Sequence, residues 1–110
     1  MVCTNPHDLM DRIATEQDRL IASRLRKNKR VLPLARRNLR RWMTRDGRHP
    51  RPVFVEWDCL LRRLSAVEIA DFLESGTPMA RRLSQSSPFA GVLSDPERLA
   101  IQRKYEKART

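Results

Sequence analysis

Apolar residues recur at steps of three and four along most of this chain, and this periodicity constrains the fold more than any other feature. The N-terminal stripe comprises Leu9, Met10, Ile13, Ala14, Leu20, Ile21 and Leu25. Side chains at that spacing share one face of an α-helix, whereas a half-buried strand needs strict alternation. Alternation extends over no more than a few residues anywhere in the sequence. The pattern therefore predicts an all-α fold, a small bundle of about five or six helices.

Residues that start and stop helices place the boundaries of these predicted helices. Asn and Ser are favoured N-caps, Pro suits the first helical position, and Ser followed three residues later by Glu forms a capping box. The first helix is expected from Asn5-Pro6 to about Lys27, the second from about Leu32 to Thr44, and the third from about Val53 to Leu64. The fourth should begin at the capping box Ser65-Ala66-Val67-Glu68 and the fifth at Thr77-Pro78. The last should run from Ser94-Asp95-Pro96-Glu97 to about Lys107.

The length of the chain suits one domain, residues 1–110. Within it we expect residues 1–51 to form a basic helical hairpin, in which the long first helix packs on the second. Residues 52–110 should form a compact C-terminal helical bundle. In this arrangement the basic segment lies exposed along one edge of the molecule.

The positive charge is concentrated in one segment. The net charge is +10 and the sequence pI is about 11.1. Between Arg19 and Arg51 the sequence has thirteen Lys or Arg residues and a single acidic residue, Asp46. The rest of the chain is close to neutral. Such a block is typical of a surface that binds a polyanion.

Four arginines of this block form the strongest candidate binding site. Arg36, Arg37, Arg40 and Arg41 are spaced to project from one side of the predicted second helix. Guanidinium groups can contact phosphate oxygens in pairs. The basic residues Arg26, Lys27, Lys29 and Arg30 extend the charge into the preceding turn. An acidic partner protein and plain solvation of a basic face remain alternatives, because charge alone does not identify the polyanion.

A second candidate resembles a helix-turn-helix between Leu64 and Leu83. Ala70 stands where close helix crossing needs a small residue, and Glu74-Ser75-Gly76 is the expected turn. The short helix after it would present Thr77, Arg81 and Arg82 to a DNA groove. Glu74 stands where such motifs prefer Gly, and Pro78 stiffens the helix start.

An apolar loop precedes the last predicted helix. It begins with Gln85, Ser86, Ser87, Pro88 and Phe89 and continues through Val92 and Leu93. We expect a structural role, in which Phe89, Val92 and Leu93 enter the core while the serine hydroxyls bind backbone groups. The alternative is an interaction site.

No pattern for catalysis or metal binding is present. The histidines are isolated, no Cys or His spacing matches a zinc site, and no glycine-rich phosphate loop occurs. We therefore expect no enzymatic activity, no cofactor, no metal and no small-molecule substrate. Cys3 and Cys59 are expected to be reduced and inert. With neither a signal-peptide pattern nor a long apolar stretch, the expected location is the cytoplasm, without a membrane partner.

Several strings, taken together, resemble one protein family. These are Asn38-Leu39 with Trp42, Trp57 with Leu60-Leu61, Gln85-Ser86-Ser87-Pro88-Phe89 with Gly91-Val92-Leu93, and Glu97-Arg98. From about Arg19 onward the chain resembles a family of small uncharacterised bacterial proteins, loosely associated with toxin–antitoxin or defence loci. The resemblance implies a compact helical module with a protein or nucleic-acid partner, and it brings no catalytic residues.

These observations lead to one functional expectation and one alternative. The chain is expected to be a non-enzymatic regulatory module of the antitoxin or accessory type that binds nucleic acid, DNA or RNA, through its arginines. The alternative is a protein-only adaptor or antitoxin that docks an acidic partner protein, such as a toxin, with the same basic surface.

Overall fold

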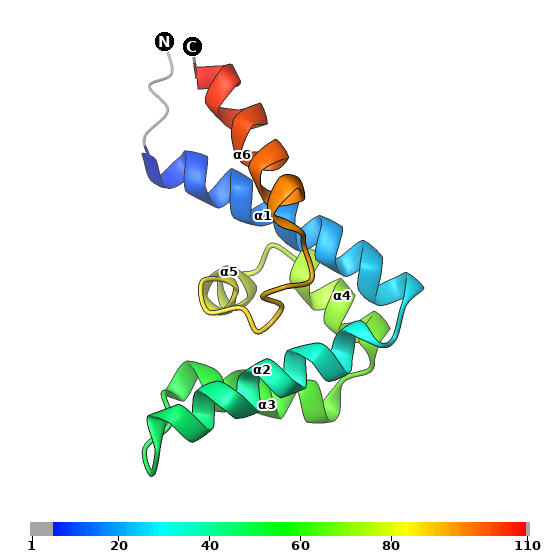
Figure 1. Ribbon diagram of the computed structural model, residues 1–110, viewed down its shortest axis with the longest axis vertical. Helices are drawn as coiled ribbons and strands as arrows, with labels where there is room; N and C mark the ends of the chain where they lie inside the picture. Colours follow the sequence, from blue (N-terminus) through cyan, green and yellow to red (C-terminus); the bar gives the residue numbers. More distant parts are fainter. Residues whose placement is uncertain (1–5, 110) are drawn as a thin grey trace.

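The computed structural model describes the backbone of residues 6–109 and the side chains of residues 9–106. This part of the chain forms six helices and no strand (Figure 1), so the predicted all-α fold is confirmed. The helices are α1 (Pro6–Lys27), α2 (Val31–Asp46), α3 (Pro52–Arg63), α4 (Ala66–Glu74), α5 (Pro78–Ser84) and α6 (Asp95–Arg109). Cys3 and the expected N-cap Asn5 lie outside the described residues.

Local capping explains where the later helices begin. Ser65 accepts a hydrogen bond from the Glu68 amide, and the Glu68 carboxylate accepts one from the Ser65 amide. Ser94 and Glu97 form the same reciprocal pair at the start of α6. Each pair satisfies two amide groups that a helix start leaves without partners. Both capping signals in the sequence are therefore confirmed.

The long helix α1 packs mainly on α4 and also on α6, while α2 packs on α3 (Figure 1). The expected packing of the first helix along the second is not observed: α1 contacts α4 far more than α2, and α1 and α2 diverge from the turn that joins them (Figure 1). Ion pairs strengthen the pairing that is observed: Arg26 of α1 binds Asp71 of α4 at 2.8 Å and also binds Glu74. Helices from residues 6–51 thus pair with helices from residues 52–109.

Trp57 of α3 lies at the centre of the core and is 0% exposed. Its indole N–H donates a 2.9 Å hydrogen bond to the carbonyl oxygen of Leu83. The rings of Phe72 and Phe89 meet Trp57 edge-on, with centroids 6.0 Å and 5.9 Å away. Such edge-to-face contacts add to the stabilisation that burial alone gives. The core therefore joins α3, α4, α5 and the loop before α6.

Within the described residues, every helix is too short or too polar to pass through a membrane.

Candidate nucleic-acid interface

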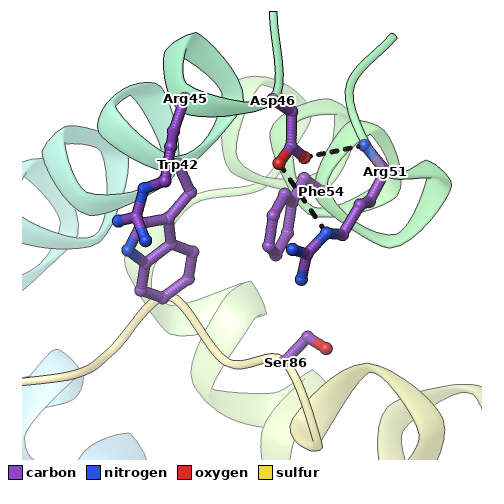
Figure 2. Close-up of a pocket in the computed structure, with 6 residues that line it drawn as sticks. All are labelled: Trp42, Arg45, Asp46, Arg51, Phe54 and Ser86. Atoms are coloured by element: carbon purple, nitrogen blue, oxygen red, sulfur yellow. Dashed lines mark hydrogen bonds and ion pairs between the residues drawn. The ribbon is translucent and has the colours of Figure 1, made fainter.

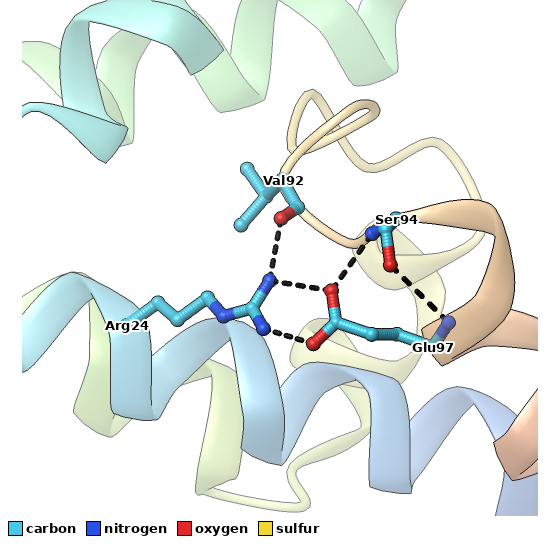
Figure 3. Close-up of polar contacts among 4 residues, drawn as sticks. All are labelled: Arg24, Val92, Ser94 and Glu97. Atoms are coloured by element: carbon cyan, nitrogen blue, oxygen red, sulfur yellow. Dashed lines mark hydrogen bonds and ion pairs between the residues drawn. The ribbon is translucent and has the colours of Figure 1, made fainter.

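The loop between α5 and α6 is held from two sides by polar side chains. The buried amide of Asn38, on α2, donates 2.9 Å hydrogen bonds to the carbonyl oxygens of Pro88 and Ala90. Arg24, on α1, donates a 2.7 Å bond to the carbonyl oxygen of Val92 and pairs with both carboxylate oxygens of Glu97 (Figure 3). Arg24 lowers the pKa of Glu97 to about 2 through this pairing. The loop thus has a defined position relative to α2.

The residues of this loop have two different roles. Phe89 and Leu93 are buried in the core, which confirms the structural role expected for them, while Val92 is half-buried. Ser87 accepts a 3.3 Å hydrogen bond from the Phe89 amide. Ser86 was expected to bind a backbone group in the same way. In the described part of the chain its hydroxyl has no such partner, and the residue lines a surface hollow instead.

Helix α2 presents several exposed arginines beside and beyond its buried face. Its buried face comprises Leu32, Ala35, Asn38 and Leu39. The exposed residues Arg37, Arg40, Arg41 and Arg45 form what we call the arginine face. Within the described residues, none of these four side chains forms an ion pair, although several arginines elsewhere do. The arginine face therefore carries positive charge that the protein itself does not neutralise.

The four arginines predicted to project from one side of this helix are not equivalent. Arg36 donates a 2.8 Å hydrogen bond to the carbonyl oxygen of Leu61 on α3, so it joins the two helices. Arg41 donates a 3.0 Å bond to the side-chain oxygen of Asn38. Arg40 lines a groove between α2 and α3 together with Arg36, Asp58 and Arg62. Arg37 has no side-chain hydrogen bond in the described structure.

Trp42 and Phe54 form the apolar part of a hollow at the end of the arginine face (Figure 2). Their ring centroids lie 5.4 Å apart and their planes are tilted by 38°. The lining of this hollow, of about 240 Å³, consists of Trp42, Arg45, Asp46, Arg51, Phe54 and Ser86. We call it the aromatic hollow.

Asp46 positions Arg51 at the edge of the aromatic hollow. Its carboxylate accepts a 3.0 Å hydrogen bond from the Arg51 amide and lies 3.7 Å from the Arg51 Nε atom. The Arg51 guanidinium carbon lies 5.4 Å from the centre of the Phe54 ring, within the range of a cation–π contact. With Arg45 also present, the lining carries one more positive charge than negative.

The predicted basic residues around the α1–α2 turn separate into two groups. Arg26 is neutralised by Asp71 and Glu74, as described above. Lys27 and Arg30 line a hollow of about 470 Å³ together with residues of the loop before α6. Lys29 is exposed. The turn therefore continues the positive surface through Lys27, Lys29 and Arg30, but not through Arg26.

The segment predicted as a helix-turn-helix forms two helices, α4 and α5, joined by a turn. Gly76 in this turn has a φ of 68°, which glycine adopts without strain. The Thr77 hydroxyl accepts a 3.1 Å hydrogen bond from the Ala80 amide and so caps α5. Arg82 pairs with Glu56 at 2.8 Å, whereas Arg81 is exposed without an ion pair in the described residues. Of the predicted contact residues, only Arg81 has a fully available side chain.

One buried acid, Asp18 on α1, has no signal in the sequence. Its side chain accepts a 2.6 Å hydrogen bond from the Ser84 hydroxyl, and the residue is 8% exposed. Burial raises the pKa of Asp18 to about 6, while the bond from Ser84 acts in the opposite direction. In the part of the chain that the structure describes, no group of three acidic, His or Cys side chains could hold a metal ion.

Arg45 and Arg51 belong to the basic block of the sequence, but the sequence does not indicate that they share a site with Trp42 and Phe54. Trp42 and Arg45 are three positions apart on α2, which is the one local signal for their proximity. Phe54 and Ser86 come from distant segments, so only the folded arrangement brings them together.

Comparisons of this chain with protein-family models, curated proteins and solved structures give no match in any of the three. The family resemblance stated above stays a prediction.

Proposed function

We propose that this chain is a non-enzymatic regulatory module that binds nucleic acid through the arginine face of α2. The observation that carries the proposal is the set of exposed arginines without ion pairs: Arg37, Arg40, Arg41 and Arg45. Arginines attached to acidic residues lose much of their attraction for an external anion. Guanidinium groups that lack such partners can release counterions from phosphates, which supplies most of the affinity in non-specific nucleic-acid binding.

The geometry of α2 supports this proposal. Arg37, Arg41 and Arg45 follow one another at four-residue steps, so they lie about 6 Å apart along the helix axis. Arg40 widens the row on one side. This helix packs on α3, and Arg36 donates a hydrogen bond to a carbonyl oxygen of α3. A supported helix holds its cationic groups in place before the polyanion arrives, which lowers the entropy cost of binding.

A matched pair of triple variants tests the proposal. Changing Arg37, Arg40 and Arg41 to Gln removes three charges from the arginine face while keeping a high helix propensity. Changing Arg12, Arg19 and Arg103 to Gln removes three exposed charges from α1 and α6, outside the arginine face, that likewise form no ion pair in the described residues. We expect the first variant to lose affinity for DNA and RNA in a fluorescence anisotropy titration and the second to bind nearly as wild type.

Two results would contradict the proposal. Equal losses in both variants would mean that net charge, and not this face, attracts the polyanion. If the wild-type protein ignores both DNA and RNA at about 50 mM salt, nucleic-acid binding is wrong. The same basic surface would then be left for the alternative partner, an acidic protein.

A further inference from the structure

We infer that the aromatic hollow is a binding site for an unpaired base of single-stranded nucleic acid. The inference rests on the proposed function and makes it more specific, because it selects single strands over duplexes. It is carried by the aromatic rings, the charges and the Ser86 hydroxyl that meet at the end of the arginine face (Figure 2).

The size of the hollow suits one ring system. Its volume of about 240 Å³ lies below the roughly 300–1,000 Å³ of pockets that enclose drug-sized ligands. A folded element of another protein is too large for such a space. A single planar base has a suitable size and shape for this space when its sugar and phosphates remain outside the hollow.

The ring of Trp42 provides the stacking surface, and the buried ring of Phe54 lies beside it. Trp42 is half-buried, whereas Trp57, the other tryptophan, is completely buried. The 38° tilt between Trp42 and Phe54 means that the two rings do not stack on each other in parallel. Aromatic side chains beside a positive groove are a common way to hold single strands, because every base has a face that can stack.

The charged residues give the flanking phosphates a place to bind. Arg45 and Arg51 both line the hollow, and Asp46 compensates only one of them. From Arg45 the row continues to Arg41 and Arg37 along α2. A backbone whose base occupies the hollow can therefore run along the arginine face, which joins base stacking to phosphate binding in one path.

Ser86 adds a group that can bind a base edge. Its hydroxyl has no hydrogen-bond partner within the described residues, unlike that of the neighbouring Ser87. A hydroxyl can donate as well as accept, so it suits the mixed polar edge of an unpaired base. In a duplex this edge is paired and the base is stacked, and removing it from the stack costs energy.

The test compares single strands and duplexes on one pair of variants. Trp42→Leu keeps an apolar side chain but removes the stacking ring, and Phe72→Leu is its control, a half-buried aromatic residue that packs on Trp57 away from the hollow. The probes are labelled dT and U single strands of about 12 nucleotides and a duplex of equal length, a length within known single-strand sites.

We expect Trp42→Leu to weaken single-strand binding by between about 5-fold and about 150-fold, the range for loss of one stacked base, and to leave duplex binding unchanged. Phe72→Leu should bind both probes as wild type does. An equal loss on single strand and duplex, or no loss on either, overturns the inference while the proposed function stands. If the wild type binds no probe at about 50 mM salt, both fail.

The intrinsic fluorescence of the wild-type protein gives a second readout that does not depend on the stability of a variant. Trp42 is the tryptophan within reach of a ligand, because Trp57 is 0% exposed. Saturation with unlabelled dT single strand should quench part of the emission, and Trp42→Leu should remove that quenching. Unchanged wild-type emission at saturation, established by anisotropy in parallel, contradicts a base in this hollow.

Discussion

Asn38 and Pro88 are joined by a buried 2.9 Å hydrogen bond from the side-chain amide of one residue to the carbonyl oxygen of the other. A second bond from the same amide reaches the carbonyl oxygen of Ala90. These bonds tie the loop that contains Ser86 to the helix that carries the arginine face. The position of Ser86 in the aromatic hollow therefore depends on a polar residue within α2.

Replacing Asn38 with Ala should lower the free energy of unfolding by about 1–3 kcal/mol, because it leaves two loop carbonyl oxygens without their donor. Urea unfolding monitored by circular dichroism measures this change. Asn28→Ala is the matched control, since Asn28 is exposed and its side chain accepts only one bond, from the Arg30 amide. A loss at position 38 no larger than that at position 28 would show that the loop needs no such attachment.

Phe89→Ala should lower the free energy of unfolding by about 3–5 kcal/mol, because the ring is 2% exposed and its removal leaves a cavity beside Trp57. The comparison is Met79→Ala, an exposed apolar residue on α5, for which a change within about 0.5 kcal/mol is expected. Chemical denaturation gives both values. A loss below about 1 kcal/mol for Phe89 contradicts its role in closing the core.

The stability of the protein should fall as the pH rises from about 4 to about 6, because of Asp18. Its pKa is raised by burial to about 6 in the folded protein, against about 3.9 when unfolded. The folded state thus holds the proton more tightly, and above pH 6 a buried charge remains. The contribution of this residue to the free energy of unfolding falls by about 2 kcal/mol across the window.

Asp18→Asn tests this sign, because an amide keeps an oxygen that can accept from Ser84 but does not ionise. Between pH 4 and pH 7 the free energy of unfolding should fall by about 2 kcal/mol less in the variant than in the wild type. Parallel pH profiles of the two proteins would mean that Asp18 titrates near its ordinary pKa.

Arg36 and Arg37 are adjacent in the sequence but should respond differently to substitution. Arg36→Gln removes the bond to the Leu61 carbonyl oxygen and should cost about 1 kcal/mol of stability. Arg37→Gln removes no internal contact that the structure describes, so stability should stay within about 0.5 kcal/mol of wild type while nucleic-acid affinity falls. Thermal unfolding and anisotropy titration of both variants give the comparison. The reverse pattern would assign the phosphate contact to Arg36.

The helices could be predicted from the sequence because their signals are local. Apolar residues at three- and four-residue steps define a helix face, and Ser65 with Glu68 marks a helix start within one short string. The partner of each helix is not a local property. The pairing of α1 with α4 depends on contacts such as that of Arg26 with Asp71. These two residues are far apart in the sequence, so the apolar periodicity does not indicate that they meet.

The candidate site was predictable only as a basic surface. The sequence showed that α2 is rich in arginine, but not that Arg36 is bonded to α3 or that Arg26 is neutralised. The aromatic hollow could not be predicted because Trp42, Phe54 and Ser86 belong to three separate segments. Their meeting depends on the packing of α2 on α3 and on the attachment of the loop by Asn38.

The salt dependence of binding to a dT single strand tests the central claim most directly. The logarithm of the association constant should fall linearly with the logarithm of salt concentration, by about 0.7 per phosphate neutralised on a single strand. If Arg37, Arg40 and Arg41 each contact a phosphate, changing all three to Gln should make the slope shallower by about 2. The Arg12, Arg19 and Arg103 variant should keep the wild-type slope. The same slope in all three proteins, or no wild-type binding at about 50 mM salt, would contradict nucleic-acid binding through the arginine face.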